Sequence, residues 1–95
     1  MGYQKDRFIF AKEWQYQKMF DDGIFETIEY KNLINHIEIY DELVEFNYNK
    51  HGGITFKIVK YDNDIYTYLT VPTRDVLHAI KRLLEYYSAR CYNGR

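Results

Sequence analysis

The pattern of hydrophobic and polar positions is most regular near the C-terminal end of the chain. Apolar side chains recur there at spacings of three and four residues, which places them on one stripe of an amphipathic helix. The stripe comprises Val76, Leu77, Ile80, Leu83, Leu84, Tyr87 and Cys91. Thr73 and Asp75 suit the start of such a helix, and Asn93 followed by Gly94 suits its end. The pattern therefore predicts a helix from about residue 74 to residue 92.

A period of two precedes this helix and predicts a β-hairpin. The segments "GITFKIVKY" and "DIYTYLTV" are rich in β-branched and aromatic residues, and "DND" separates them. A two-residue turn would pair either Tyr61 with Asp64 or Asp62 with Ile65. Both registers keep the two faces of the hairpin separate, because side chains alternate along a strand. One face is aliphatic, and the other carries tyrosine, threonine and lysine.

The segment "ELVEFNYN" predicts a third strand, in which Val44, Phe46 and Tyr48 share one face. The first 40 residues have a weaker pattern, with helices expected over residues 8–21 and 25–36, although "RFIF" alternates like a short strand. The predicted fold class is α+β: a three-stranded antiparallel meander packed on a C-terminal amphipathic helix, with an N-terminal helical segment across or beside the sheet. No repeat or linker divides the chain, so residues 1–95 form one predicted domain.

The second face of the hairpin raises the main functional question, because one apolar face is enough to seal a sheet against a core. Val59, Tyr61, Tyr66 and Tyr68 lie on that second face, with Lys57 beside them. If the N-terminal segment covers these tyrosines, they form a second core layer, which is the interpretation we favour from the sequence. If it does not, they form a binding surface.

Composition and motifs argue against several functional classes. The chain has 95 residues, one cysteine and no apolar run near the roughly 20 residues of a membrane span. No signal-peptide core follows the N-terminal charges, so we expect a cytoplasmic protein. No phosphate-binding loop, spaced metal ligands or visible nucleophile–base pair occurs, which predicts no cofactor, no metal site and no enzymatic activity. A hydrolase or nuclease built from scattered carboxylates is a minor alternative.

Residue usage points to an AT-rich genome. Phe, Tyr, Met, Ile, Asn and Lys, whose codons are AT-rich, total 43 residues, whereas Gly, Ala, Arg and Pro total 14. Together with the small size, this usage favours a protein encoded by a virus or another mobile element. Its site of action would then be the cytoplasm of the host cell.

Charge is unevenly spread along the chain. Residues 21–45 carry eight acids against Lys31 alone, for a net charge of −7, with apolar and aromatic residues between them. Such a segment suits docking onto a basic protein groove. We therefore expect a non-enzymatic protein-binding module that inhibits a host nucleic-acid enzyme or defence system, in the manner of anti-CRISPR proteins. The candidate contact residues are Glu26, Glu29, Tyr30, Glu38, Tyr40, Asp41, Glu42 and Glu45.

The alternative is a small DNA- or RNA-binding regulator. Tyrosine and lysine on an open sheet can stack on bases and pair with phosphates, and the C-terminal helix adds basic residues. The candidate residues are Lys57, Tyr66, Tyr68, Arg74, Lys81 and Arg82. A net charge of −1 argues against this alternative. A homodimer, in which the basic and acidic surfaces of two copies meet, is a further alternative, and an exposed tyrosine-rich sheet would serve it as well.

Overall fold

The computed structural model describes residues 7–60 and 65–93, with side chains described as far as residue 90. In chain order its elements are β1 (Phe8–Phe10), α1 (Glu13–Asp21), the short 3₁₀ helix η1 (Ile24–Glu26), α2 (Ile28–Ile39), β2 (Glu42–Tyr48), β3 (Ile54–Lys60), β4 (Tyr66–Val71) and α3 (Val76–Asn93). Helix α3 starts close to the predicted position, with the Asp75 carboxylate accepting a hydrogen bond from the amide of His78. None of the described helices is both long and apolar enough to span a membrane.

Four strands form one sheet in the order β1-β2-β3-β4. Strands β2, β3 and β4 pair antiparallel, as predicted, and the α+β class is confirmed. The prediction of three strands is wrong by one, because β1 pairs parallel to β2 with Phe8 opposite Val44. A parallel neighbour needs a crossover connection, which α1, η1 and α2 supply. The helix expected over residues 8–21 thus begins only at Glu13, after a strand.

The described part of the hairpin adopts one of the two predicted registers. Val59 opposes Tyr66 in this pairing. The same register, continued toward the turn, belongs to the alternative with Tyr61 opposite Asp64, although residues 61–64 lie outside the described part of the chain. The two faces therefore stay separate, as the period of two requires.

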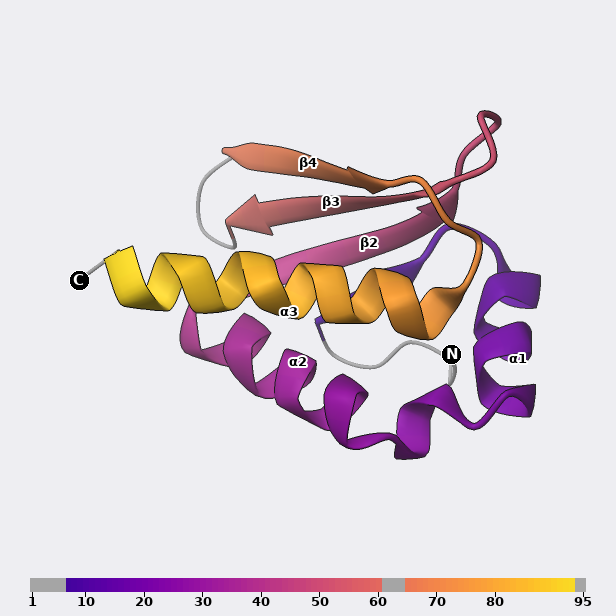
Figure 1. Ribbon diagram of the computed structural model, residues 1–95, viewed down its shortest axis with the longest axis horizontal. Helices are drawn as coiled ribbons and strands as arrows, with labels where there is room; N and C mark the ends of the chain where they lie inside the picture. Colours follow the sequence, from indigo (N-terminus) through magenta and orange to yellow (C-terminus); the bar gives the residue numbers. More distant parts are fainter. Residues whose placement is uncertain (1–6, 61–64, 94–95) are drawn as a thin grey trace.

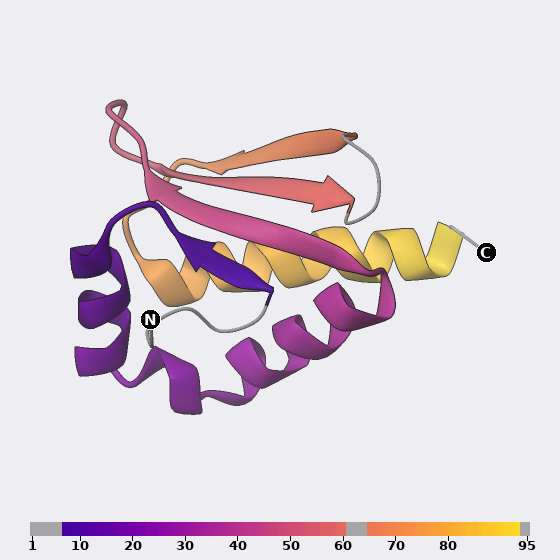
Figure 2. The ribbon, with the colours of Figure 1, turned by 180° about the vertical axis from the view of Figure 1, so that it is seen from behind.

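Helices α2 and α3 lie on the same side of the sheet, and α1 stands at one end of the strands (Figures 1 and 2). Ile80, Leu83 and Tyr87 of α3 are fully buried, as the stripe predicts. Strand β1 turns Phe8 and Phe10 toward the same layer, so the chain that follows it packs there as well. The favoured interpretation, that the N-terminal segment covers the hairpin tyrosines, is therefore wrong.

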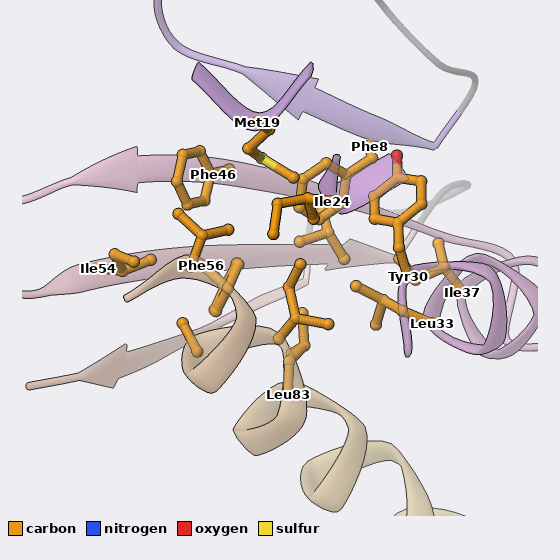
Figure 3. Close-up of a cluster of buried hydrophobic side chains, with 14 of the residues drawn as sticks. Phe8, Met19, Ile24, Tyr30, Leu33, Ile37, Phe46, Ile54, Phe56 and Leu83 are labelled. Atoms are coloured by element: carbon orange, nitrogen blue, oxygen red, sulfur yellow. The ribbon is translucent and has the colours of Figure 1, made fainter. Parts of the chain in front are cut away.

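The core lies between the sheet and this layer of helices (Figure 3). Phe8, Phe46 and Phe56, from three neighbouring strands, are fully buried. The ring centroids of Phe8 and Phe46 are 6.3 Å apart, and those of Phe46 and Phe56 are 5.9 Å apart. Tyr30 of α2 meets Phe8 edge-on at 5.6 Å, and Met19 of α1 is also fully buried. Aromatic contacts at these distances add to the stabilisation from buried apolar area.

Two backbone positions set how β2 and β3 enter the sheet. Asp41, just after α2, has a φ of 57° in the left-handed region, and its carboxylate lies 2.9 Å from the Arg7 guanidinium. At the start of β3, a Cβ atom on Gly53 would lie only 2.6 Å from the carbonyl oxygen of Val71. Only glycine fits this approach, which allows the loop before β3 to lie against the end of β4.

Candidate binding surface

The side of the sheet that faces away from α3 is covered by none of the described helices (Figure 2). Its side chains come from alternate positions of all four strands, which we call the open face. The open face comprises Ile9, Leu43, Glu45, Asn47, Thr55, Lys57, Val59, Tyr66, Tyr68 and Thr70. The residues between them along each strand point to the core side, because side chains alternate.

Tyr66 and Tyr68 project from the open face and are 52% and 59% exposed. Their rings meet edge to face with centroids 5.6 Å apart. The ammonium of Lys57 lies 4.6 Å from the centroid of the Tyr66 ring. These contacts limit the freedom of the rings before any partner binds, so less entropy is lost on binding. The two tyrosines are therefore suited to act as anchors of an interface.

The charges of the open face balance each other. Glu45 stands directly opposite Lys57, and the other residues of the open face are neutral. Leu43, Val59 and Tyr66 lie opposite one another across β2, β3 and β4, next to the positions of Glu45 and Lys57. A balanced surface attracts neither polyanions nor polycations at long range. Binding here would depend on apolar and aromatic contact and on hydrogen bonds from the tyrosine hydroxyls.

The residues of the nucleic-acid alternative do not form one surface. Lys57 and the two tyrosines share the open face. Lys81 and Arg82 are exposed on α3, which lies on the opposite side of the sheet (Figure 1). The Arg82 guanidinium also lies 3.3 Å from the Glu85 carboxylate. Of these candidates, only Lys57, Tyr66 and Tyr68 therefore lie together on the open face.

Arg74 occupies a third place, in the connection between β4 and α3. Its guanidinium lies 4.6 Å from the centroid of the Tyr48 ring and donates to the carbonyl of Asn49 over 3.3 Å. The indole of Trp14 stacks on the same Tyr48 ring at 5.3 Å. Arg74 therefore packs on the end of the sheet rather than on the open face.

Two of the acidic-segment candidates are buried. Tyr30 is 6% exposed and packs edge-on against Phe8 and Phe25. Glu42 is 5% exposed, and its carboxylate accepts hydrogen bonds from Tyr87 and Arg90. Neither side chain is presented to a partner, so the prediction that they belong to a contact surface is wrong for this structure.

The remaining acidic candidates are dispersed. Tyr40 lies under the Arg90 guanidinium at 4.2 Å, and Asp41 pairs with Arg7. The other four occupy three separate places: Glu26 and Glu29 near the start of α2, Glu38 near its end, and Glu45 on the open face. The twelve residues of α2 separate its ends by about 18 Å. The −7 segment thus forms no single acidic surface.

A scan against protein-family models and searches of the curated proteins and of the solved structures found no match. The function is therefore argued from this chain's own residues.

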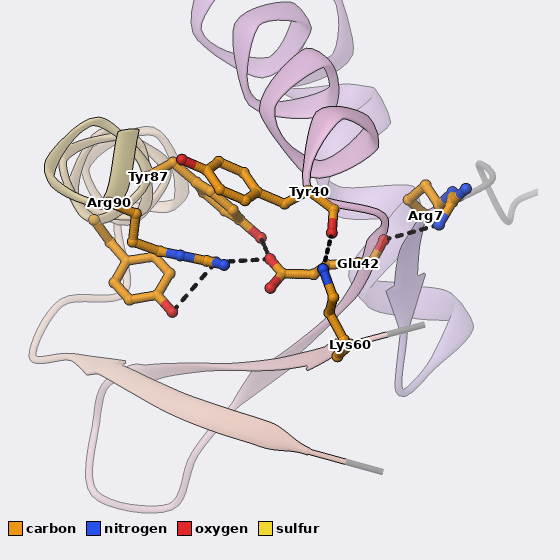
Figure 4. A network of polar contacts seen from close by, with 7 residues as sticks. Arg7, Tyr40, Glu42, Lys60, Tyr87 and Arg90 are labelled. Carbon is orange, nitrogen blue, oxygen red and sulfur yellow. Dashed lines mark hydrogen bonds and ion pairs between the residues drawn. The ribbon is translucent and has the colours of Figure 1, made fainter. Parts of the chain in front are cut away.

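Sequence reasoning missed a polar network between the sheet and α3 (Figure 4). One carboxylate oxygen of Glu42 accepts from the Tyr87 hydroxyl and from the Arg90 guanidinium, each at 2.8 Å. Lys60 donates to the carbonyl of Tyr40 over 2.7 Å. Glu42 shares a face with Val44 in β2, so the period of two already placed it on the buried side. The network joins α2, α3, β2 and β3 at one end of the sheet.

The network shifts two pKa values. Burial raises the pKa of the Tyr87 hydroxyl above its ordinary value, and its hydrogen bond to Glu42 raises it further. The hydrogen bond to Glu42 raises the pKa of Arg90. Tyr87 therefore stays a neutral donor and Arg90 stays a cation. These are the protonation states that stabilise a buried carboxylate.

A shallow cleft of about 320 Å³ opens beside this network. Its lining comprises Glu42, Ile58, Lys60, Ile65, Thr67, Tyr86 and Arg90. Both cations in the lining already donate to oxygens of the protein, since Lys60 bonds Tyr40 and Arg90 bonds Glu42. Within the described residues, no group of three or more His, Cys, Asp or Glu side chains is placed to hold a metal ion. The open face is therefore the stronger candidate for a functional site.

Proposed function

We propose that this chain is a non-enzymatic binding protein that contacts another protein through the open face of its sheet. The observation that carries the proposal is the exposure of Tyr66 and Tyr68, at 52% and 59%, on a face that no described helix covers. Tyrosine is enriched at the centres of protein interfaces, where charged residues are depleted. The partner surface we expect is largely apolar and uncharged, with acceptors for the tyrosine hydroxyls.

The contact surface that we propose, the open face, therefore differs from the acidic segment that the sequence favoured. The partner protein stays part of the proposal, but Glu45 is the one acidic candidate on the open face. The other candidates of the acidic segment are buried, internally paired or on other elements. Inhibition of a host nucleic-acid enzyme or defence system, by a protein of viral or mobile-element origin in the host cytoplasm, stays a prediction. Such an inhibitor would act by covering an apolar functional surface of its target rather than by imitating nucleic acid.

Nucleic-acid binding stays the second candidate, because Lys57 lies beside the two exposed aromatic rings. Base stacking on such rings does not depend on sequence and adds to phosphate contacts. Titration of labelled single-stranded DNA and RNA at low salt tests it. Binding that weakens steeply with salt would favour this candidate, whereas no binding at low salt would remove it.

Site-specific photo-crosslinking tests the protein-binding proposal. A benzophenone amino acid replaces Tyr68, or Phe20 of α1 as a matched control, since the two positions are 59% and 60% exposed. The variants are irradiated in nuclease-treated lysate of host cells. We expect adducts with one defined protein at Tyr68 and none with that protein at Phe20.

Competition then separates a specific contact from incidental capture. Unlabelled wild-type chain should abolish the adduct, while the double variant Tyr66→Ala with Tyr68→Ala should compete about 30-fold less well or worse. Reversal of Glu26 and Glu38 to lysine should leave competition unchanged within about threefold. Equal capture at Phe20, or full competition by the tyrosine variant, would overturn the proposal.

A further inference from the structure

The free edge of β4 offers a second binding feature, made of backbone groups rather than side chains. Strand β4 ends the sheet, and among the described residues no strand pairs beyond it. The amide of Lys60 donates to the carbonyl of Ile65, so residues 65, 67, 69 and 71 direct their backbone groups toward β3. The backbone groups of Tyr66, Tyr68 and Thr70 therefore point outward, away from the sheet.

The two edges of the sheet differ in how they are protected. Strand β1, at the other edge, has only three residues. Very short edge strands, charged side chains and prolines discourage pairing with another chain. Strand β4 has six residues, "YTYLTV", with no charge, proline or glycine among them. Its edge is thus suited to accept a further strand.

We propose that a second copy of this chain binds this edge, so that β4 pairs antiparallel with β4 of the other copy around a two-fold axis at Tyr68. With the axis there, Tyr68 faces its own counterpart, and Tyr66 of each copy faces Thr70 of the other. All three outward residues then find partners inside β4, and each facing pair exchanges two hydrogen bonds. With an axis at Thr67, Thr70 would face a residue before the start of β4. With an axis at Leu69, Tyr66 would face a residue after its end.

Self-complementarity selects a second copy over an unrelated strand. No charged residue occurs from Ile65 to Thr73, so two copies meet without like charges in opposition. On the open side, Tyr68 would face Tyr68 and Tyr66 would face Thr70. On the helix side, Thr67 would face Leu69. Aromatic and β-branched pairs of this kind stabilise antiparallel sheets. The same patch serves both copies, as a two-fold interface requires.

Pairing would also double the proposed contact surface. The open faces of the two copies would form one continuous sheet surface, with the exposed tyrosines of both copies near its centre. The dimer does not depend on the proposed partner, because it concerns the purified chain alone. A chain that stays monomeric but loses its partner when Tyr66 and Tyr68 are replaced would refute the dimer and leave the proposed function intact.

Sedimentation equilibrium of the purified chain, from micromolar to millimolar concentration, measures the pairing. The expected mass rises from 11.6 kDa toward twice that value. Thr70→Pro removes an outward amide in each copy while retaining both tyrosines, and should raise the dimer dissociation constant at least about tenfold. Thr55→Ala is the control, because it leaves every backbone amide of β4 in place. It loses the 3.3 Å contact with the Thr70 hydroxyl and the 2.9 Å hydrogen bond from the Asn49 side chain, and it should dimerise normally.

Disulfide trapping provides an independent readout if Thr70→Pro fails to fold. In a Cys91→Ser background, Tyr68→Cys should form a disulfide-linked dimer under mild oxidation. Glu45→Cys lies in the same row of the open face but on an inner strand, and should remain monomeric. A wild-type chain that stays at 11.6 kDa up to millimolar concentration would overturn the proposal. Equal trapping of the two cysteine variants would overturn it as well.

Discussion

The hydroxyl of Tyr87 donates a 2.8 Å hydrogen bond to the carboxylate of Glu42, which joins α3 to the first residue of β2. Arg90, almost one helical turn further along, reaches the same carboxylate oxygen. These contacts and the apolar core lie on the helix side of the sheet. Within the described residues, the fold is therefore stabilised from the helix side, and no described helix covers the open face.

The Glu42 network predicts a large cost for removing its central carboxylate. Glu42→Ala should lower the free energy of unfolding by roughly 3 kcal/mol, because Arg90 and the Tyr87 hydroxyl would lose their shared acceptor. Urea unfolding followed by circular dichroism measures the change. Glu85→Ala is the control, because Glu85 pairs with Arg82 on the exposed side of α3. This substitution should lower the free energy of unfolding by less than about 1 kcal/mol. Equal costs for the two variants would show that the network contributes no more than a surface pair.

Tyr87 predicts a loss of stability at alkaline pH. Its pKa is raised in the folded chain, mainly by burial, above the ordinary value of 10.0. Above pH 10 the unfolded chain releases this proton while the folded chain keeps it, so the free energy of unfolding falls as pH rises. The contribution is about 1.4 kcal/mol per pH unit for one proton. Tyr87→Phe should make the slope above pH 10 shallower by that amount, and an unchanged slope would contradict the assignment.

Substitutions on the two faces of the sheet should differ sharply in their effect on stability. Tyr66→Ala and Tyr68→Ala each remove an exposed ring and should lower the free energy of unfolding by less than about 1 kcal/mol. Phe56→Ala removes a fully buried ring and should cost about 3–5 kcal/mol. Thermal and urea unfolding distinguish these outcomes. A cost for the tyrosines that approached that of Phe56 would mean that they are core residues.

Gly53 predicts a packing defect at the loop between β2 and β3. In Gly53→Ala the new methyl group would meet the carbonyl oxygen of Val71 at 2.6 Å, so β4 must shift. We expect a loss of about 1–3 kcal/mol in the free energy of unfolding. Gly52→Ala is a useful comparison, because a Cβ at Gly52 meets nothing within 4 Å, although its φ of 88° still carries strain. A Gly53→Ala variant as stable as wild type would contradict the close approach.

The elements with long, regular patterns could be predicted from the sequence. Helix α3 offers several turns of spacing at three and four residues, and β3 and β4 alternate over six or seven residues. Strand β1 could not be distinguished from the start of a helix by its pattern, because its three residues fit both. Its pairing with β2 depends on contacts between positions that are distant in sequence, such as Phe8 and Val44.

The misplaced site residues have a common physical origin. Tyr30 was grouped with its acidic neighbours in sequence, yet its spacing to Leu33 and Ile37 is that of one helix face, and all three are buried. Charge counted along a segment ignores this periodicity. No pattern in the sequence indicates which face of the sheet the N-terminal helices cover. That choice follows from β1, whose phenylalanines face the same side as α3.

Nuclear magnetic resonance with a soluble paramagnetic agent tests the central claim, an uncovered tyrosine face, most directly. The agent broadens the ring resonances of tyrosines that contact solvent and spares those that do not. We predict strong broadening for Tyr66 and Tyr68 and little for Tyr30 and Tyr87, which are 6% and 0% exposed. Protection of Tyr66 and Tyr68 comparable to that of Tyr87 would contradict the open face, and with it the proposed mode of binding.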